Sequence, residues 1–143
     1  MSALFQVDDL GRLFISPAIE DWTALSARGI DAVIDLDGGI DAGVPTTHNR
    51  QIYVYFPIFD ENLPDLERLS AVVTLGSTLV RSGHRVLSHC GMGFNRSALV
   101  AGLILYELGM PGPSVVERLR ERRPGALFND QFAEHLMGLP PRP

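Results

Sequence analysis

The residues best suited to chemistry lie between positions 89 and 97, which read His-Cys-Gly-Met-Gly-Phe-Asn-Arg-Ser. Five residues separate Cys90 from Arg96, and Ser97 follows at once. A loop of this length can turn successive backbone N–H groups inward, and a helix after it adds its own unpaired N–H groups and the positive end of its dipole. An anion is the expected occupant of such a loop.

Two side chains in this loop predict what happens to the anion. Arg96 can give two parallel, charge-assisted hydrogen bonds to a pair of phosphate oxygens, a geometry that lysine does not match. The same positive surroundings stabilise Cys90 as a thiolate, the nucleophilic form of cysteine. Ser97 is placed to donate a hydrogen bond to the sulfur when it leaves. We therefore predict that Cys90 attacks a bound phosphate ester.

The remaining loop residues are expected to shape the backbone around the anion. Gly91 and Gly93 permit dihedral angles and close approaches that a Cβ atom would obstruct. His89 and Asn95 are expected to hold the loop in shape. A lone cysteine is more often a small buried apolar residue, and the Cys-Arg spacing alone arises easily by chance. The agreement of all these residues, between a strand and an apolar helix, favours the catalytic interpretation.

Expulsion of an alkoxide or phenolate requires a proton donor that faces the cysteine. Asp60 is the best candidate, because it follows a strong strand in the stretch Phe-Pro-Ile-Phe-Asp and precedes a helix. Glu61 and Asp65 compete for this role, and each of the three acids could instead be a solvated loop residue or a helix cap. His48, His84 and His135 are interpreted as ordinary surface or packing residues.

Strand and helix patterns alternate along the chain and predict an α/β fold. Helix starts and ends are marked by proline and glycine, including a helix that opens at Ser16-Pro17 and continues to Ala27. The expected strands cover residues 13–15, 32–36, 52–56 and 86–87, and the other expected helices cover 64–80, 98–108, 114–122 and 130–137.

Composition restricts the possible functions. The chain has 143 residues, 45% of them hydrophobic, and is interpreted as one domain over 1–143 with a core of its own. A net charge of −5 argues against nucleic acid as a partner. Cys90 is the single cysteine, which excludes an internal disulfide and a thiolate zinc cluster. The longest apolar run, 98–105, is too short to span a membrane, and no secretory signal opens the chain, so a cytoplasmic location is expected.

One basic cluster lies outside the loop. Arg118, Arg120, Arg122 and Arg123 alternate with two glutamates, Glu117 and Glu121. Acidic and basic residues three or four positions apart pair along a helix and weaken the local field. We interpret the cluster as a solvated helix face.

Residues 89–97 resemble the signature loop of the protein tyrosine phosphatase superfamily, in particular its compact dual-specificity branch. Residues 13–36 resemble the opening strand, helix and strand of that branch, and Arg122-Arg123-Pro124 with Asn129 and Phe132 resembles its C-terminal segment. Residues 37–50 match nothing in the family. The resemblance implies a three-layer α/β/α sandwich around a mixed, mostly parallel sheet.

The resemblance also implies a mechanism. Phosphate would be bound by Gly91, Met92, Gly93, Phe94, Asn95 and Arg96, without metal or other cofactor, and a phosphocysteine would form on Cys90. Arg123 would support the loop from behind. The expected substrates are phosphorylated proteins or small phosphomonoesters: phosphotyrosine, with phosphoserine and phosphothreonine also admitted by a shallow cleft.

Three other functions stay open. Residues 93–97 also resemble the loop of RNA 5′-triphosphatases of the superfamily, although those enzymes typically lack the acid. A phosphoinositide phosphatase is less favoured, because residues 91–95 contain no basic side chain. The third is a phosphate-binding module without catalysis. The oligomeric state cannot be predicted from these residues.

Overall fold

The computed structural model of the chain describes residues 3–141. A five-stranded sheet with the order β1-β2-β5-β3-β4 forms its centre. β1 is antiparallel to β2, and the remaining neighbours are parallel, as predicted for a mixed, mostly parallel sheet. The strands are β1 (Phe5–Gln6), β2 (Leu13–Ser16), β3 (Ala32–Asp35), β4 (Ile52–Tyr55) and β5 (Val86–His89).

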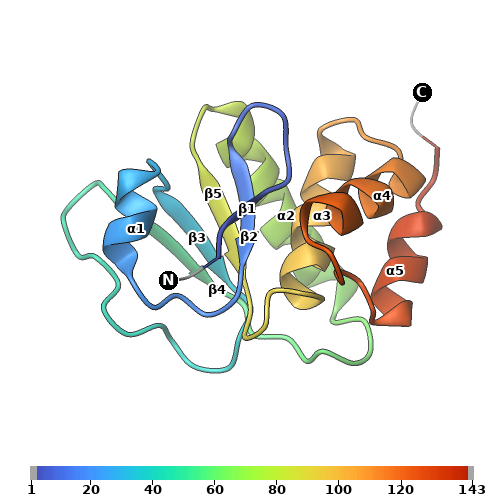
Figure 1. Cartoon of the computed structure of the whole chain (residues 1–143), viewed down its shortest axis with the longest axis horizontal. Helices are drawn as coiled ribbons and strands as arrows, with labels where there is room; N and C mark the ends of the chain where they lie inside the picture. The colour runs from blue at the N-terminus through green and yellow to red at the C-terminus, as the bar shows by residue number, and fades with distance from the viewer. Residues whose placement is uncertain (1–2, 142–143) are drawn as a thin grey trace.

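Helices cover both faces of the sheet, which confirms the predicted three-layer sandwich. Figure 1 shows α1 on one side and the other four helices on the opposite side. Within residues 3–141, no helix is long and apolar enough to cross a membrane. The helices are α1 (Trp22–Ala27), α2 (Leu66–Arg81), α3 (Arg96–Glu107), α4 (Gly112–Arg122) and α5 (Asp130–Met137).

The two faces of the sheet are packed unequally. Every residue of β2, β3 and β5 is buried, as expected for parallel strands covered on both sides. The larger core lies between the sheet and α2–α5 and includes nearly the whole of α3. A smaller cluster, centred on Phe14, Val33 and Leu87, packs under α1. The apolar helix after the cysteine is therefore held rigidly at the centre of the molecule.

The parallel strands end at one edge of the sheet, and this edge positions the candidate site. The registers align Ser16 of β2, Asp35 of β3 and Tyr55 of β4 with His89, the last residue of β5. Cys90 follows immediately. In parallel α/β sheets, ligands bind in crevices outside the carboxyl ends of the strands.

One predicted helix begins later than expected. Instead of opening at Ser16-Pro17, α1 begins at Trp22, because Asp21 caps it by accepting a hydrogen bond from the N–H of Thr23. The intervening segment runs beside the catalytic loop, where the N–H of Ala18 donates to the carbonyl of Gly91 over 3.2 Å. The two-residue strand β1 was not predicted either, because so short an edge strand leaves no periodic pattern.

The contact between α4 and α5 provides a test of the packing. A Cβ atom added to Gly112 would lie 2.1 Å from the carbonyl oxygen of Leu136, a backbone atom that cannot turn aside. We expect Gly112→Ala to lower the free energy of unfolding by about 1–3 kcal/mol in urea denaturation. Gly38→Ala is the matched control, because a Cβ there has no atom within 4 Å. Equal midpoints for the two variants would contradict this packing.

Candidate active site

The loop from Cys90 to Arg96 joins β5 to α3 and encloses the sulfur. Cys90 is only 2% exposed. Its Sγ accepts a hydrogen bond from the N–H of Gly93 over 3.2 Å and lies 3.4 Å from Oγ of Ser97. The structure thus brings the predicted nucleophile and the predicted hydrogen-bond donor to its sulfur together.

Several donors of the loop lack an acceptor within the protein. Among residues 3–141, the N–H groups of Gly91, Met92, Phe94 and Asn95 donate to no protein atom. Nε of Arg96 is buried and likewise has no partner in the described part of the chain. An unpaired buried donor such as this Nε is rare in proteins because it costs free energy. Together with the four N–H groups of the same loop, it indicates a site for an anion.

Arg96 is anchored through one nitrogen. Nη1 donates to the carbonyls of Leu36 and Ile58 over 3.4 and 3.3 Å, and lies 3.3 Å from Oδ1 of Asp37. These contacts come from the segments after β3 and β4. They fix the plane of the guanidinium while leaving Nε without a protein partner, so one side of the fork remains available for an oxyanion.

The shape of the loop depends on Gly93. Its φ of +75° lies in the left-handed region, and a Cβ there would be 2.7 Å from the backbone nitrogen of Pro17. Arg123, at the end of α4, donates to the carbonyls of Met92 and Gly93 over 3.2 and 3.3 Å. Its guanidinium also packs against the rings of Phe94 and Phe5, 3.9 and 4.5 Å from their centroids. These contacts confirm that Arg123 supports the loop.

Asp60 is tied to the catalytic loop through two asparagines. Its two carboxylate oxygens accept hydrogen bonds from Nδ2 of Asn95 and Nδ2 of Asn129, each over 2.9 Å. Oδ1 of Asn95 in turn accepts from the backbone N–H of Asn129 over 2.9 Å. Asn129 also caps α5. The acid loop, the catalytic loop and the C-terminal segment are therefore locked together.

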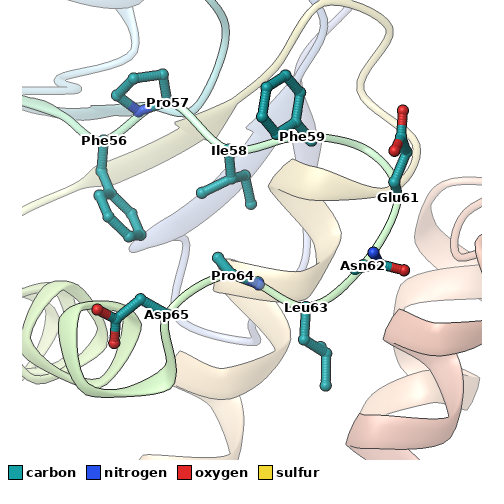
Figure 2. Close-up of a pocket in the computed structure, with 9 residues that line it drawn as sticks. All are labelled: Phe56, Pro57, Ile58, Phe59, Glu61, Asn62, Leu63, Pro64 and Asp65. Atoms are coloured by element: carbon teal, nitrogen blue, oxygen red, sulfur yellow. The ribbon is translucent and has the colours of Figure 1, made fainter.

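The geometry separates Asp60 from its competitors. Asp65 caps α2, and hydrogen bonds from the backbone and then the side chain of Arg68 lower the pKa of Asp65. Glu61 is exposed, and Figure 2 shows its side chain pointing away from the interior of the arc formed by residues 56–65. Asp60 and Glu61 both line a cleft of about 670 Å³ together with Arg96, but it is the Asp60 carboxylate that Asn95 of the loop holds. Its role as the acid remains a prediction.

Aromatic side chains form the walls beside Asp60. Phe59 is 82% exposed and Tyr55 is 38% exposed, and both line the cleft. In Figure 2, Phe59 points outward from the arc, whereas Phe56 and Ile58 point into it, around a small cavity of about 300 Å³. The cleft therefore offers aromatic surface next to the anion site.

His89 belongs to a buried polar cluster that sequence reasoning missed. Its side chain is fully buried, with Nε2 2.6 Å from Oδ2 of Asp41 and 3.4 Å from Oδ1 of Asp35. Tyr53 donates to the other oxygen of Asp35. Burial raises the pKa of Asp41, against the opposing effect of His89. The three ligand-type atoms lie within 4.8 Å of one another, but the direct 2.6 Å contact already pairs the imidazole with a carboxylate.

The segment without a family counterpart, residues 37–50, delivers two carboxylates to the site. Asp37 reaches Arg96 and Asp41 reaches His89. The segment is held by the hydroxyls of Tyr55 and Tyr53, which accept from the N–H groups of Gly39 and Asp41 over 2.7 and 2.8 Å. No motif marked these aspartates. The one feature of the sequence that could have indicated them is the pair Tyr53 and Tyr55, two residues apart on one face of β4. Their hydroxyls need hydrogen-bond partners, and this segment supplies them.

The other polar residues lie outside the cleft. His84 pairs with Asp31 over 2.8 Å at the opposite edge of the sheet, and His135 lies on α5, where burial lowers its pKa. The arginines of α4 have partners beyond the helix. Arg122 lies 3.9 Å from Glu121, a pairing within the helix, but Arg118 and Arg122 also lie within 4 Å of Asp9, and Arg120 donates to backbone carbonyls.

Neither a family model nor a curated protein sequence matches the chain. Solved structures do match it along nearly their whole length. The active form of Tk-PTP has a TM-score of 0.71 and 27% identity over 94% of this chain and 95% of that one. Human DUSP28 has a TM-score of 0.75 and 23% identity, over 93% of this chain and 89% of that one. The human tyrosine phosphatase-like serine/threonine/tyrosine-interacting protein has a TM-score of 0.74 and 23% identity, over 93% of this chain and 92% of that one.

These matches agree with the loop and with the order of the elements. In fold, the chain resembles the compact, dual-specificity-like phosphatases of the protein tyrosine phosphatase superfamily. Its fold is that of phosphatases, and this supports phosphatase function at the level of the fold.

Arg123 allows a test of loop positioning. Arg123→Met keeps the aliphatic stem but removes both hydrogen bonds to the loop carbonyls. We expect kcat/KM for a phosphomonoester to fall roughly 10- to 100-fold, because small displacements of reacting groups are costly. Arg120→Met is the control, since its partners are the carbonyls of Ala126 and Leu127. A similar loss in both variants would show that Arg123 acts only through stability.

Proposed function

We propose that the chain is a metal-independent cysteine phosphatase that hydrolyses phosphate monoesters, with phosphotyrosine as the main substrate and phosphoserine and phosphothreonine also accepted. The observation that supports this most is the loop itself. Cys90 begins a loop in which four N–H groups have no acceptor among residues 3–141, and the loop ends at Arg96, whose buried Nε has no partner there either. Such a loop binds a tetrahedral dianion and places its phosphorus against the sulfur.

In the first step, Sγ of Cys90 attacks phosphorus as the thiolate. The S–P bond forms while the bond from phosphorus to the ester oxygen breaks, and Asp60 gives its proton to that oxygen. Arg96 and the loop N–H groups bind the equatorial oxygens, whose charge they stabilise through the transition state. The products of this step are the free alcohol or phenol and a phosphocysteine.

In the second step, water replaces the sulfur. Asp60, now a carboxylate, takes a proton from the water as its oxygen attacks phosphorus, and the S–P bond breaks. The electron pair returns to sulfur, where the hydroxyl of Ser97, 3.4 Å away, stabilises the departing thiolate. Asp60 is protonated again, and inorganic phosphate leaves. The cycle consumes one water per ester and needs no external oxidant or metal.

The alternatives differ in what they require of the cleft. A 5′-triphosphatase or a phosphoinositide phosphatase must accommodate several phosphates, whereas Arg96 is the only basic residue among the described residues 3–141 that line the cleft. A binding module without catalysis would not need an acid fixed to the loop, yet Asp60 accepts two hydrogen bonds there. Hydrolysis of a single phosphate is therefore the better supported function.

Replacement of the nucleophile tests the proposal directly. We expect the protein to hydrolyse p-nitrophenyl phosphate in the presence of EDTA, and Cys90→Ser to abolish turnover because an unactivated hydroxyl is a much weaker nucleophile. Release of p-nitrophenol is the measurement. If the unmodified protein binds phosphate but releases no product, the binding module is the correct function instead.

Replacement of Asp60 tests its proposed role as the general acid. With phenyl phosphate, whose leaving group is poor, we expect Asp60→Asn to lower kcat/KM by about 10²- to 10⁴-fold and to remove the alkaline limb of the pH profile. With p-nitrophenyl phosphate the loss is smaller, because its leaving group departs without full protonation. Glu61→Gln is the control and keeps both rates. The reverse pattern would assign the acid to Glu61.

A further inference from the structure

The two edges of the parallel sheet differ in their balance of charges. At the edge where the strands begin, Arg12 and Arg85 immediately precede β2 and β5, Arg50 lies two residues before β4, and Asp31 immediately precedes β3. At the edge where the strands end, the carboxylates outnumber the basic groups. They are Asp35, Asp37, Asp41, Asp60 and Glu61, four of them within the two loops that follow β3 and β4. The catalytic end is therefore acidic.

Within the cleft, a single cation faces several carboxylates. Arg96 is the one basic side chain among the described residues that line it, and Asp60 and Glu61 line it as well. Asp37 approaches the same guanidinium to 3.3 Å, and its side chain is 38% exposed. Glu61 is exposed, and within residues 3–141 only its backbone carbonyl has a partner, Nδ2 of Asn129.

This arrangement sets the charge that a ligand can carry. One phosphate group binds the N–H groups of the loop and pairs with Arg96. A second negative group on the ligand then meets Asp37 and Glu61 without a further cation to pair with, whereas a positive group meets the Glu61 carboxylate, which has no partner among the described residues. Because these carboxylates are partly solvated, each contact is modest in energy and sensitive to salt.

On the basis of the proposed function, we propose that the substrates are phosphopeptides with lysine or arginine adjacent to the phosphorylated residue. Glu61 selects this basic neighbour, and Asp37 assists it while holding Arg96. The same carboxylates reject ligands with several phosphates. The exposed rings of Tyr55 and Phe59 complete the cleft by contacting an aromatic phosphorylated side chain.

A pair of phosphotyrosine peptides of equal length tests the proposal, one with lysine and one with glutamate on both sides of the phosphotyrosine. We expect kcat/KM to be about 3- to 10-fold higher for the lysine peptide in low salt, the range that one or two exposed ion pairs provide. The ratio should shrink in about 0.5 M salt, because screening shortens the reach of exposed charges.

Two single substitutions test whether Glu61 is the residue that favours the lysine peptide. Glu61→Gln should at least halve the ratio of kcat/KM for the lysine peptide to kcat/KM for the glutamate peptide. Glu61→Lys should bring this ratio below one. Both variants should hydrolyse p-nitrophenyl phosphate as fast as the unmodified protein, which also shows that they are folded. Glu117→Gln, on the exposed side of α4, removes the same charge away from the cleft and should leave the ratio unchanged.

The outcomes distinguish this inference from the proposed function. If p-nitrophenyl phosphate and both peptides are not hydrolysed, the proposed function fails and the inference fails with it. If p-nitrophenyl phosphate is hydrolysed but the glutamate peptide reacts as fast as the lysine peptide, only the inference is overturned. Faster release of phosphate from RNA 5′-triphosphate than from the lysine peptide would overturn it as well. A ratio unchanged by Glu61→Lys would remove Glu61 from the selection.

Discussion

The close contact of Gly93 with the end of β2 is the constraint on which the site depends. A Cβ atom at this position would lie 2.7 Å from the nitrogen of Pro17 and 2.8 Å from the carbonyl carbon of Ser16. The backbone of the same residue donates to the sulfur of Cys90 and accepts from Arg123. One glycine thus fixes the loop against the sheet, the nucleophile and α4 at once. A bulkier residue would disturb all three contacts together.

Around this fixed loop, two segments of the chain add three carboxylates. Asp37 and Asp41 come from the segment after β3, and Asp60 comes from the segment after β4. Each is held by a different neighbour: Arg96 for Asp37, His89 for Asp41, and the two asparagines for Asp60. Because a carboxylate near an anion site opposes binding, their accumulation requires a compensating role. Positioning, proton transfer and charge selection are three such roles.

Much of this arrangement could be predicted from the sequence, because local patterns determine it. The Cys-to-Arg spacing, the glycines and the apolar helix after them place Cys90, Arg96 and Ser97 at one turn between a strand and a helix, and the strand before Asp60 places that residue on a neighbouring loop. Parallel strand order then follows from the alternation of strands and helices. The late start of α1 was missed because a proline that can open a helix also suits an extended segment, and the cap at Asp21 decides between them.

The partners of the site residues could not be predicted in the same way, because they come from segments distant in sequence. Asp41 meets His89 across 48 residues, and Asn129 meets Asp60 across 69. Neither pair leaves a local pattern, since an aspartate or asparagine in a loop satisfies its own backbone just as readily. What selects the distant contact is burial. His89 is fully buried at the end of β5, so its Nε2 must find a polar partner within the protein, and the tyrosine hydroxyls of β4 hold residues 37–50 where Asp41 supplies it. The segment that resembles nothing in the family is therefore required by the residue next to the nucleophile.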